Sequence, residues 1–94
     1  MAVDLKKCDC STVRLSEKRI RLGEIDIYYA LCEINDGQSE KYTCAVVDSG
    51  EVRCAVFSDT EKAHEFYELI SENEVDTASF DGILHDFLYV NNML

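Results

Sequence analysis

The chain has 94 residues, enough for one domain, and 47% of them are hydrophobic, which makes an unfolded chain a poor first expectation. The formal net charge is −10, and it is concentrated towards the C-terminus: residues 58–94 carry nine acids and one base, whereas residues 1–24 carry six bases and four acids. Because such an acidic surface repels phosphate backbones, and because no segment is apolar enough to span a bilayer, we expect neither a nucleic-acid nor a membrane partner.

Residues 1–11 show no hydrophobic period, so we expect a tail or loose edge segment there and a single domain over residues 12–94. The segment lacks the apolar run of a signal peptide, which favours a cytoplasmic protein with reduced thiols. Cys8 and Cys10 are spaced more closely than the usual metal-binding Cys-x-x-Cys pair. A reduced tail is expected there, with a metal site as the open alternative, and no motif indicates a cofactor.

The first two expected strands alternate in hydrophobicity. The parity of the alternation changes between residues 13–15 and residues 20–22, which predicts a bulge near Ser16–Lys18. Gly23-Glu24 can close a tight turn that sets Leu22 opposite Ile25 and Ile20 opposite Ile27. This hairpin would add a further strand to a meander.

Asp36-Gly37 is the strongest hairpin signal, because both central residues of a type I′ turn need a positive φ. Taken as a two-residue turn, it places Tyr29 opposite Cys44. Asp48-Ser49-Gly50 suits a three-residue loop that places Val46 opposite Val52. The two registers agree on one apolar face, which would consist of Ile25, Ile27, Tyr29, Leu31, Tyr42, Cys44, Val46, Val52, Cys54 and Val56.

Two helices are expected after the strands. Ser58 is the predicted N-cap of the first, with Glu61 completing a capping box, and residues 72–74 end it. Asp76 caps the second helix, where Val75 and Phe80 are placed as a hydrophobic staple. The apolar stripes are Ala63, Phe66, Tyr67 and Ile70, then Phe80, Ile83, Leu84, Phe87 and Leu88. Packing both stripes on one sheet face predicts an α+β fold, an antiparallel β-meander of three to four strands followed by two C-terminal helices.

The C-terminal run Val75-Asp76-Thr77, Phe80 and 83–88 (Ile-Leu-His-Asp-Phe-Leu) resembles the ending of a family of short proteins of unknown function from clostridia-like bacteria. The resemblance covers about residues 25–90, and its family-like motif here is Asp86, Phe87 and Leu88. Thr77 stands where that family has proline, and Gly82 and His85 stand where acids are usual. The resemblance implies the order of elements and a cytoplasmic location, and it carries no activity.

No arrangement of residues predicts catalysis. There is no Gly-x-Ser-x-Gly elbow and no glycine-rich phosphate loop. Cys44 and Cys54 are predicted to be buried cross-strand neighbours, which suits reduced apolar thiols better than nucleophiles. His64 is expected on a polar helix face and His85 near Asp81, with neither close to Cys8. We therefore expect a protein that is not an enzyme.

The other face of the predicted sheet is more apolar than a solvated face should be. By the same registers it carries Tyr28, Ala30, Cys32, Ile34, Ala45, Val47, Ala55 and Phe57. Contiguous apolar surface on a small protein indicates a partner, with partial cover by Val13 and Leu15 as the alternative.

The sequence therefore favours a non-enzymatic interaction module that binds another protein with a basic surface, or itself as a homodimer through this second face. Two further functions stay open. One is an acidic, nucleic-acid-mimicking inhibitor of a basic partner, and the other is a small enzyme that uses Asp86, His85 or a helix carboxylate.

Overall fold

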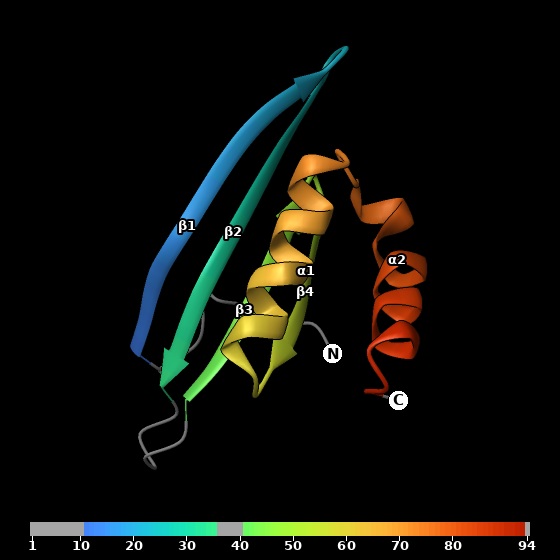
Figure 1. Cartoon of the computed structure of the whole chain (residues 1–94). Coiled ribbons are helices and arrows are strands. Elements are labelled where there is room, and N and C mark those ends of the chain that lie inside the picture. Colours follow the sequence, from blue (N-terminus) through green and yellow to red (C-terminus); the bar gives the residue numbers. More distant parts are fainter. Residues whose placement is uncertain (1–10, 36–40, 94) are drawn as a thin grey trace.

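A computed structural model of the chain describes residues 11–35 and 41–93. A four-stranded antiparallel sheet in the order β1-β2-β3-β4 is followed by two helices, as expected for the predicted α+β meander (Figure 1). The elements are β1 (Ser11–Leu22), β2 (Ile25–Asn35), β3 (Lys41–Asp48), β4 (Val52–Phe57), α1 (Thr60–Glu72) and α2 (Thr77–Val90). Ser11 already belongs to β1, whereas residues 1–10 of the expected tail and the Asp36-Gly37 turn lie outside the described residues.

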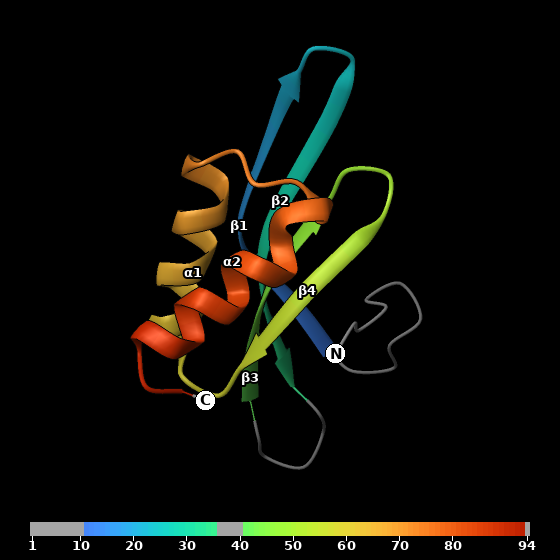
Figure 2. The same ribbon diagram turned by 90° about the vertical axis from the view of Figure 1, so that its right-hand side faces the viewer.

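Both helices lie on the same side of the sheet, which we call the inner face (Figure 2). α1 packs over β2, β3 and β4, and α2 packs over β3 and β4. The opposite side is the outer face. The β1–β2 hairpin extends beyond the end of α1, as Figure 1 shows.

The first hairpin forms as predicted. Leu22 pairs with Ile25 and Ile20 pairs with Ile27 around a turn in which Gly23 has φ +63°. The predicted bulge is present one residue earlier than expected, because the register shifts between Arg14 and Ser16 and leaves Leu15 as the extra residue.

The predicted register of β2 against β3 is wrong. Asn35 pairs with Lys41, so five residues (36–40) separate the paired positions, and Tyr29 faces Val47 instead of Cys44. β4 follows in a shifted register with Val46 opposite Cys54, because the loop of β3–β4 consists of residues 49–51, with Gly50 at φ +104°. An odd-numbered shift moves every side chain of β3 to the other face of the sheet, and β4 moves with it.

This correction exchanges the two faces of β3 and β4. Four residues predicted for the outer face lie in the core beneath the helices: Ala45, Val47, Ala55 and Phe57. The predicted inner residues Cys44, Val46 and Cys54 instead pack together on the outer face. Val13, expected to cover the outer face, is opposite Glu33 and more than half exposed.

Four phenylalanines join the layers. The Phe66 ring, fully buried on α1, lies 5.7 Å from that of Phe57, 5.5 Å from that of Phe80 and 5.2 Å from that of Phe87, measured between centroids. The Phe66–Phe80 pair meets edge to face, an arrangement that favours aromatic contacts. The predicted helical stripes are therefore confirmed as the contacts of α1 and α2 with the sheet.

The helix ends are set by capping. Asp59, not Ser58, caps α1: its carboxylate accepts hydrogen bonds from the N–H groups of Glu61 (2.9 Å) and Lys62 (3.3 Å). The predicted Asp76 cap of α2 is confirmed, with its carboxylate accepting from Ser79 N–H at 3.0 Å. Asp59 is one residue closer to the first turn than Ser58, and the two residue types cap equally well, so the pattern alone could not separate them.

Candidate functional site

Two surfaces of the molecule could serve a partner: the outer face of the sheet, which the sequence singled out, and a groove between the two helices, which it did not.

The outer face contains half of the residues predicted for it. Tyr28, Ala30, Cys32 and Ile34 lie there, joined by three residues expected in the core. Its centre is closed to solvent, because six side chains are at most 6% exposed: Ala30, Cys32, Ile34, Cys44, Val46 and Cys54. Among the described residues of this face, the most accessible apolar side chains lie at its margin, where Val52 and Val56 of β4 are 42% and 38% exposed. The centre of this face is therefore not open to a partner in this conformation.

Three cysteines meet at the centre of the outer face, and they hold no disulfide. Cys32 pairs directly with Cys44 across β2 and β3. Burial raises the pKa of Cys32, and a hydrogen bond with Cys54, together with burial, raises the pKa of Cys44. A thiol held protonated at neutral pH is a poor nucleophile, so these cysteines act as small apolar residues.

A polar group borders the outer face at β1. The Tyr28 hydroxyl donates a hydrogen bond to the Glu17 carboxylate at 2.8 Å, and Glu17 also lies 3.2 Å from an Arg14 guanidinium nitrogen. The guanidinium of Arg19 lies over the Tyr28 ring, 4.5 Å from its centroid, in cation–π geometry. Burial, followed by the hydrogen bond to Glu17, raises the pKa of Tyr28. Tyr28 is thus half-buried in a small charged network.

The second surface begins at the connection between the helices. Glu74 has φ +54°, a left-handed conformation, and the next N–H, that of Val75, donates to the Ile70 carbonyl at 3.0 Å. These contacts form a Schellman-type end of α1 without glycine. The turn directs Val75 into the core and leaves Glu74 exposed.

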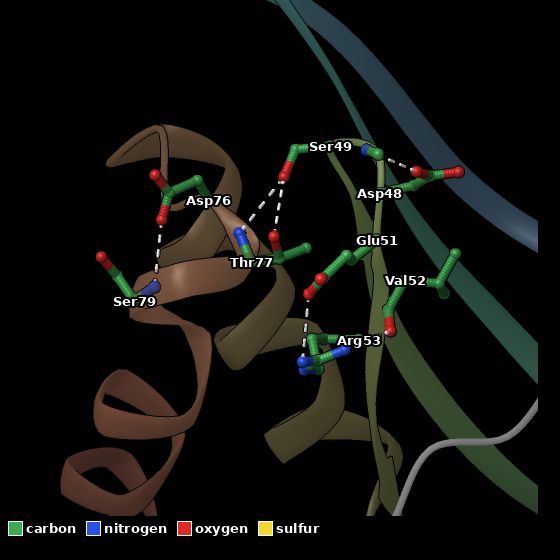
Figure 3. Close-up of polar contacts among 9 residues, drawn as sticks. Asp48, Ser49, Glu51, Val52, Arg53, Asp76, Thr77 and Ser79 are labelled. Atoms are coloured by element: carbon green, nitrogen blue, oxygen red, sulfur yellow. Dashed lines mark hydrogen bonds and ion pairs between the residues drawn. The ribbon is translucent and has the colours of Figure 1, made fainter.

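Hydrogen bonds fix this connection to the sheet. The buried Tyr29 hydroxyl donates to the Val75 carbonyl at 2.9 Å, and burial raises the pKa of Tyr29 to about 12. Ser49, in the β3–β4 loop, contacts Thr77 at the start of α2, with 3.0 Å between the hydroxyl oxygens (Figure 3). The Thr77 N–H also donates to the Ser49 hydroxyl at 3.4 Å. The N-terminus of α2 is therefore held in place relative to β2 and the β3–β4 loop.

A groove of about 640 Å³ opens along the junction of α1 and α2. Its apolar lining comes mainly from one face of α2, together with α1 and the connection: Leu69, Val75, Ile83, Phe87 and Val90. Three carboxylates border it: Glu74, Asp76 and Asp86. No sequence pattern indicated this groove; in the structure the apolar end of α2 beside it is exposed, with Tyr89 and Val90 at 72% and 76%.

The family-like motif lies partly in this groove. Asp86 is exposed at its border, Phe87 is half-buried in its floor and in the aromatic cluster, and Leu88 packs against the core from the other side of α2. The motif thus combines one surface acid with two residues that attach α2 to the sheet.

The histidines do not join either surface. His64 is exposed on α1, with its Nε2 3.0 Å from a Glu68 carboxylate oxygen, and His85 is exposed on α2. Over the described ranges, 11–35 and 41–93, no three His, Cys, Asp or Glu side chains lie close enough to hold a metal ion. Cys8 and Cys10 lie outside those ranges. Within the same residues, no helix is long and apolar enough to cross a membrane.

Comparisons with protein-family models, with curated proteins and with solved structures found no match to this chain. The resemblance of residues 25–90 to the clostridia-like family therefore stays a proposal.

Proposed function

We propose that the protein is a non-enzymatic interaction module that binds a basic surface of another protein through its two helices. The observation that carries the proposal is the segregation of charge by layer. Residues 58–94 carry nine acids, with Lys62 as the only lysine or arginine, and both helices that they form lie on one side of the sheet. An acidic layer of this kind speeds the encounter with a basic partner and disfavours acidic ones.

Accessible apolar side chains in the same layer supply affinity. Tyr89 and Val90 are among the most exposed large hydrophobic residues of the described chain, and the groove beside Val90 offers further apolar surface. Apolar area bordered by charge is a common composition for a surface that binds another protein. The proposal thus assigns attraction at a distance to the acids and contact energy to the apolar end of α2.

Self-association through the outer face is the second candidate, and the exposed β4 margin favours it. Val52 and Val56 project from this edge strand, and Tyr28 lies at the other margin of the same face. Sedimentation of the purified protein at high micromolar concentration tests this candidate. A dimer that Val56→Lys dissociates would support it, and a strict monomer would remove it.

The small-enzyme alternative would need an acid or base withdrawn from solvent in a pocket. Asp86 and His85 are both exposed, which gives it no support. The nucleic-acid-mimicking inhibitor is a special case of the proposed function, in which the basic partner is itself a nucleic-acid-binding protein.

The proposed function is tested by affinity capture from the native cell at low and high salt. Three baits are compared: the wild-type protein, a helix-layer variant (Asp81→Lys/Asp86→Lys) and an outer-margin variant (Tyr28→Lys/Val56→Lys). All of these positions are exposed or half-buried, so folding should be retained, which circular dichroism checks. We expect partners that salt and the helix-layer variant both remove. Partners lost only with the outer-margin variant would contradict the proposal.

A further inference from the structure

We propose that the groove between α1 and α2 is the docking site for a short amphipathic segment of the partner, with aliphatic side chains on one face and lysine or arginine on the other. This inference rests on the proposed function and adds to it a location and an occupant. The occupant follows from two properties of the groove, its apolar floor and its one-sided charge.

The floor of the groove matches a segment with one apolar face. Ile83, Phe87 and Val90 line it from α2 at spacings of four and three residues, so they form a single stripe along the helix. Ser79 extends this stripe towards the start of α2, and the full set spans about 16 Å at the helical rise. That length accommodates about three turns of an incoming helix, whose own apolar residues would repeat every three or four positions.

The rim supplies the charge. Glu74 and Asp86 are exposed at the border, and Asp76 lies between them in sequence at the start of α2. Asp76 already accepts the capping hydrogen bond of Ser79, which leaves its second oxygen available to a cation. Lysine or arginine on the polar face of the segment would complement these acids, whereas an acidic segment would be repelled.

The two ends of the groove also differ in charge. At the end near the C-terminus of α2, the lining residue Asn91 accepts a hydrogen bond from the Lys62 ammonium group at 3.0 Å. Lys62 also lies 3.1 Å from a Glu65 carboxylate oxygen. One end of the groove therefore holds a cation, and the other end, at Glu74 and Asp76, holds only acids among its charged lining residues. The basic residues of the segment are expected beside Glu74, Asp76 and Asp86, and none is expected beside Lys62.

The test uses a synthetic helical peptide as long as α2 (14 residues), with leucine on one face and lysine on the other. It is titrated into the isotopically labelled full-length protein while backbone amide shifts are followed by NMR. A second peptide carries glutamate in place of lysine. Two matched variants follow: Asp86→Lys at the rim of the groove and Asp81→Lys, an exposed acid of the same helix that does not line it.

We expect the lysine peptide to shift the amides of residues 73–76 and of the groove stripe of α2, and the glutamate peptide to leave them unchanged. Asp86→Lys should weaken binding about fivefold more than Asp81→Lys, the effect of losing and reversing one close ion pair. If both variants weaken binding equally and the shifts are spread over both helices, the groove is not the docking site, but the proposed function of the acidic helical layer is unaffected. If the lysine peptide does not bind, or if the shifts are confined to the sheet, the docking site is also refuted. Affinity capture tests the proposed function independently of this result.

Discussion

Replacing Tyr29 with phenylalanine should destabilise the protein at neutral pH and stabilise it, relative to the wild type, at high pH. The Tyr29 hydroxyl is fully buried and donates to the Val75 carbonyl at 2.9 Å. Losing one such hydrogen bond costs about 1 kcal/mol of the free energy of unfolding near pH 7. The contact holds the connection that forms one end of the helical groove, so the measurement also reports on the candidate site.

The pH dependence follows from the burial of the hydroxyl. Burial raises the pKa of Tyr29 from 10.0 to about 12 in the folded protein. The folded state therefore keeps a proton that the unfolded chain loses, so this contribution to stability is complete below pH 10 and declines as the pH rises from 10 to 12. At about pH 11 the wild type should lose about 1.4 kcal/mol that the phenylalanine variant does not lose. The difference between the two proteins should then change sign.

Urea unfolding followed by circular dichroism, at about pH 7 and about pH 11, measures both effects. Tyr28 and Tyr67 also have a raised pKa, but they are present in both proteins and cancel in the comparison. A stability difference that is the same at the two pH values would refute the reasoning, because it would mean that the folded protein does not withhold the Tyr29 hydroxyl from ionisation.

Three further predictions concern the caps, the glycines and the thiols. Asp59→Ala should lower the free energy of unfolding by about 1 kcal/mol, whereas Ser58→Ala should change it by less than about 0.5 kcal/mol. If urea unfolding shows the larger loss for Ser58→Ala, Ser58 and not Asp59 caps α1. Gly82→Ala should raise the free energy of unfolding by about 0.5–1 kcal/mol, and with it the melting temperature, because nothing lies within 4 Å of the added methyl group in this helix. Gly50→Ala should lower the melting temperature, because Gly50 has φ +104°. Equal effects of the two substitutions would contradict the assigned backbone conformations. In a Cys8→Ser/Cys10→Ser background, Cys32, Cys44 and Cys54 should react with a thiol reagent only on unfolding, and rapid labelling of the native protein would show that the outer face is open.

The sequence predicted those parts of the fold in which the spacing of the residues is compatible with only one local arrangement. The stripe of α1 from Ala63 to Ile70, the Asp76 cap and the pairing of Leu22 with Ile25 all depend on local spacing, and all three are confirmed. Local spacing also indicated that both helices would share one face of the sheet, because only the sheet could cover their stripes.

The faces of β3 could not be predicted in the same way. Residues 44–47 are apolar at every position, and β3 is buried on both faces, so alternation does not distinguish the set with Cys44 from the set with Ala45. The register then depended on the length of one turn, and a two-residue reading of Asp36-Gly37 gave the wrong parity. The predicted outer face was wrong for the same reason, because half of the residues assigned to it lie in the core.

The groove was not predictable for a different reason. Its lining combines α1, the connection and α2, and depends on how closely the two helices pack. Helical periodicity gives the face that each helix buries, but the angle and distance between helices depend on tertiary contacts such as those of Tyr29 with Val75 and of Ser49 with Thr77.

The central claim is that a basic partner binds the helical layer and not the outer face of the sheet. Amide hydrogen exchange of the full-length protein, measured with and without the captured partner, tests it most directly. We predict slower exchange in residues 73–76 and along α2, with the exchange of β2 to β4 unchanged. Protection confined to the strands of the sheet, with α2 exchanging as in the isolated protein, would contradict the claim.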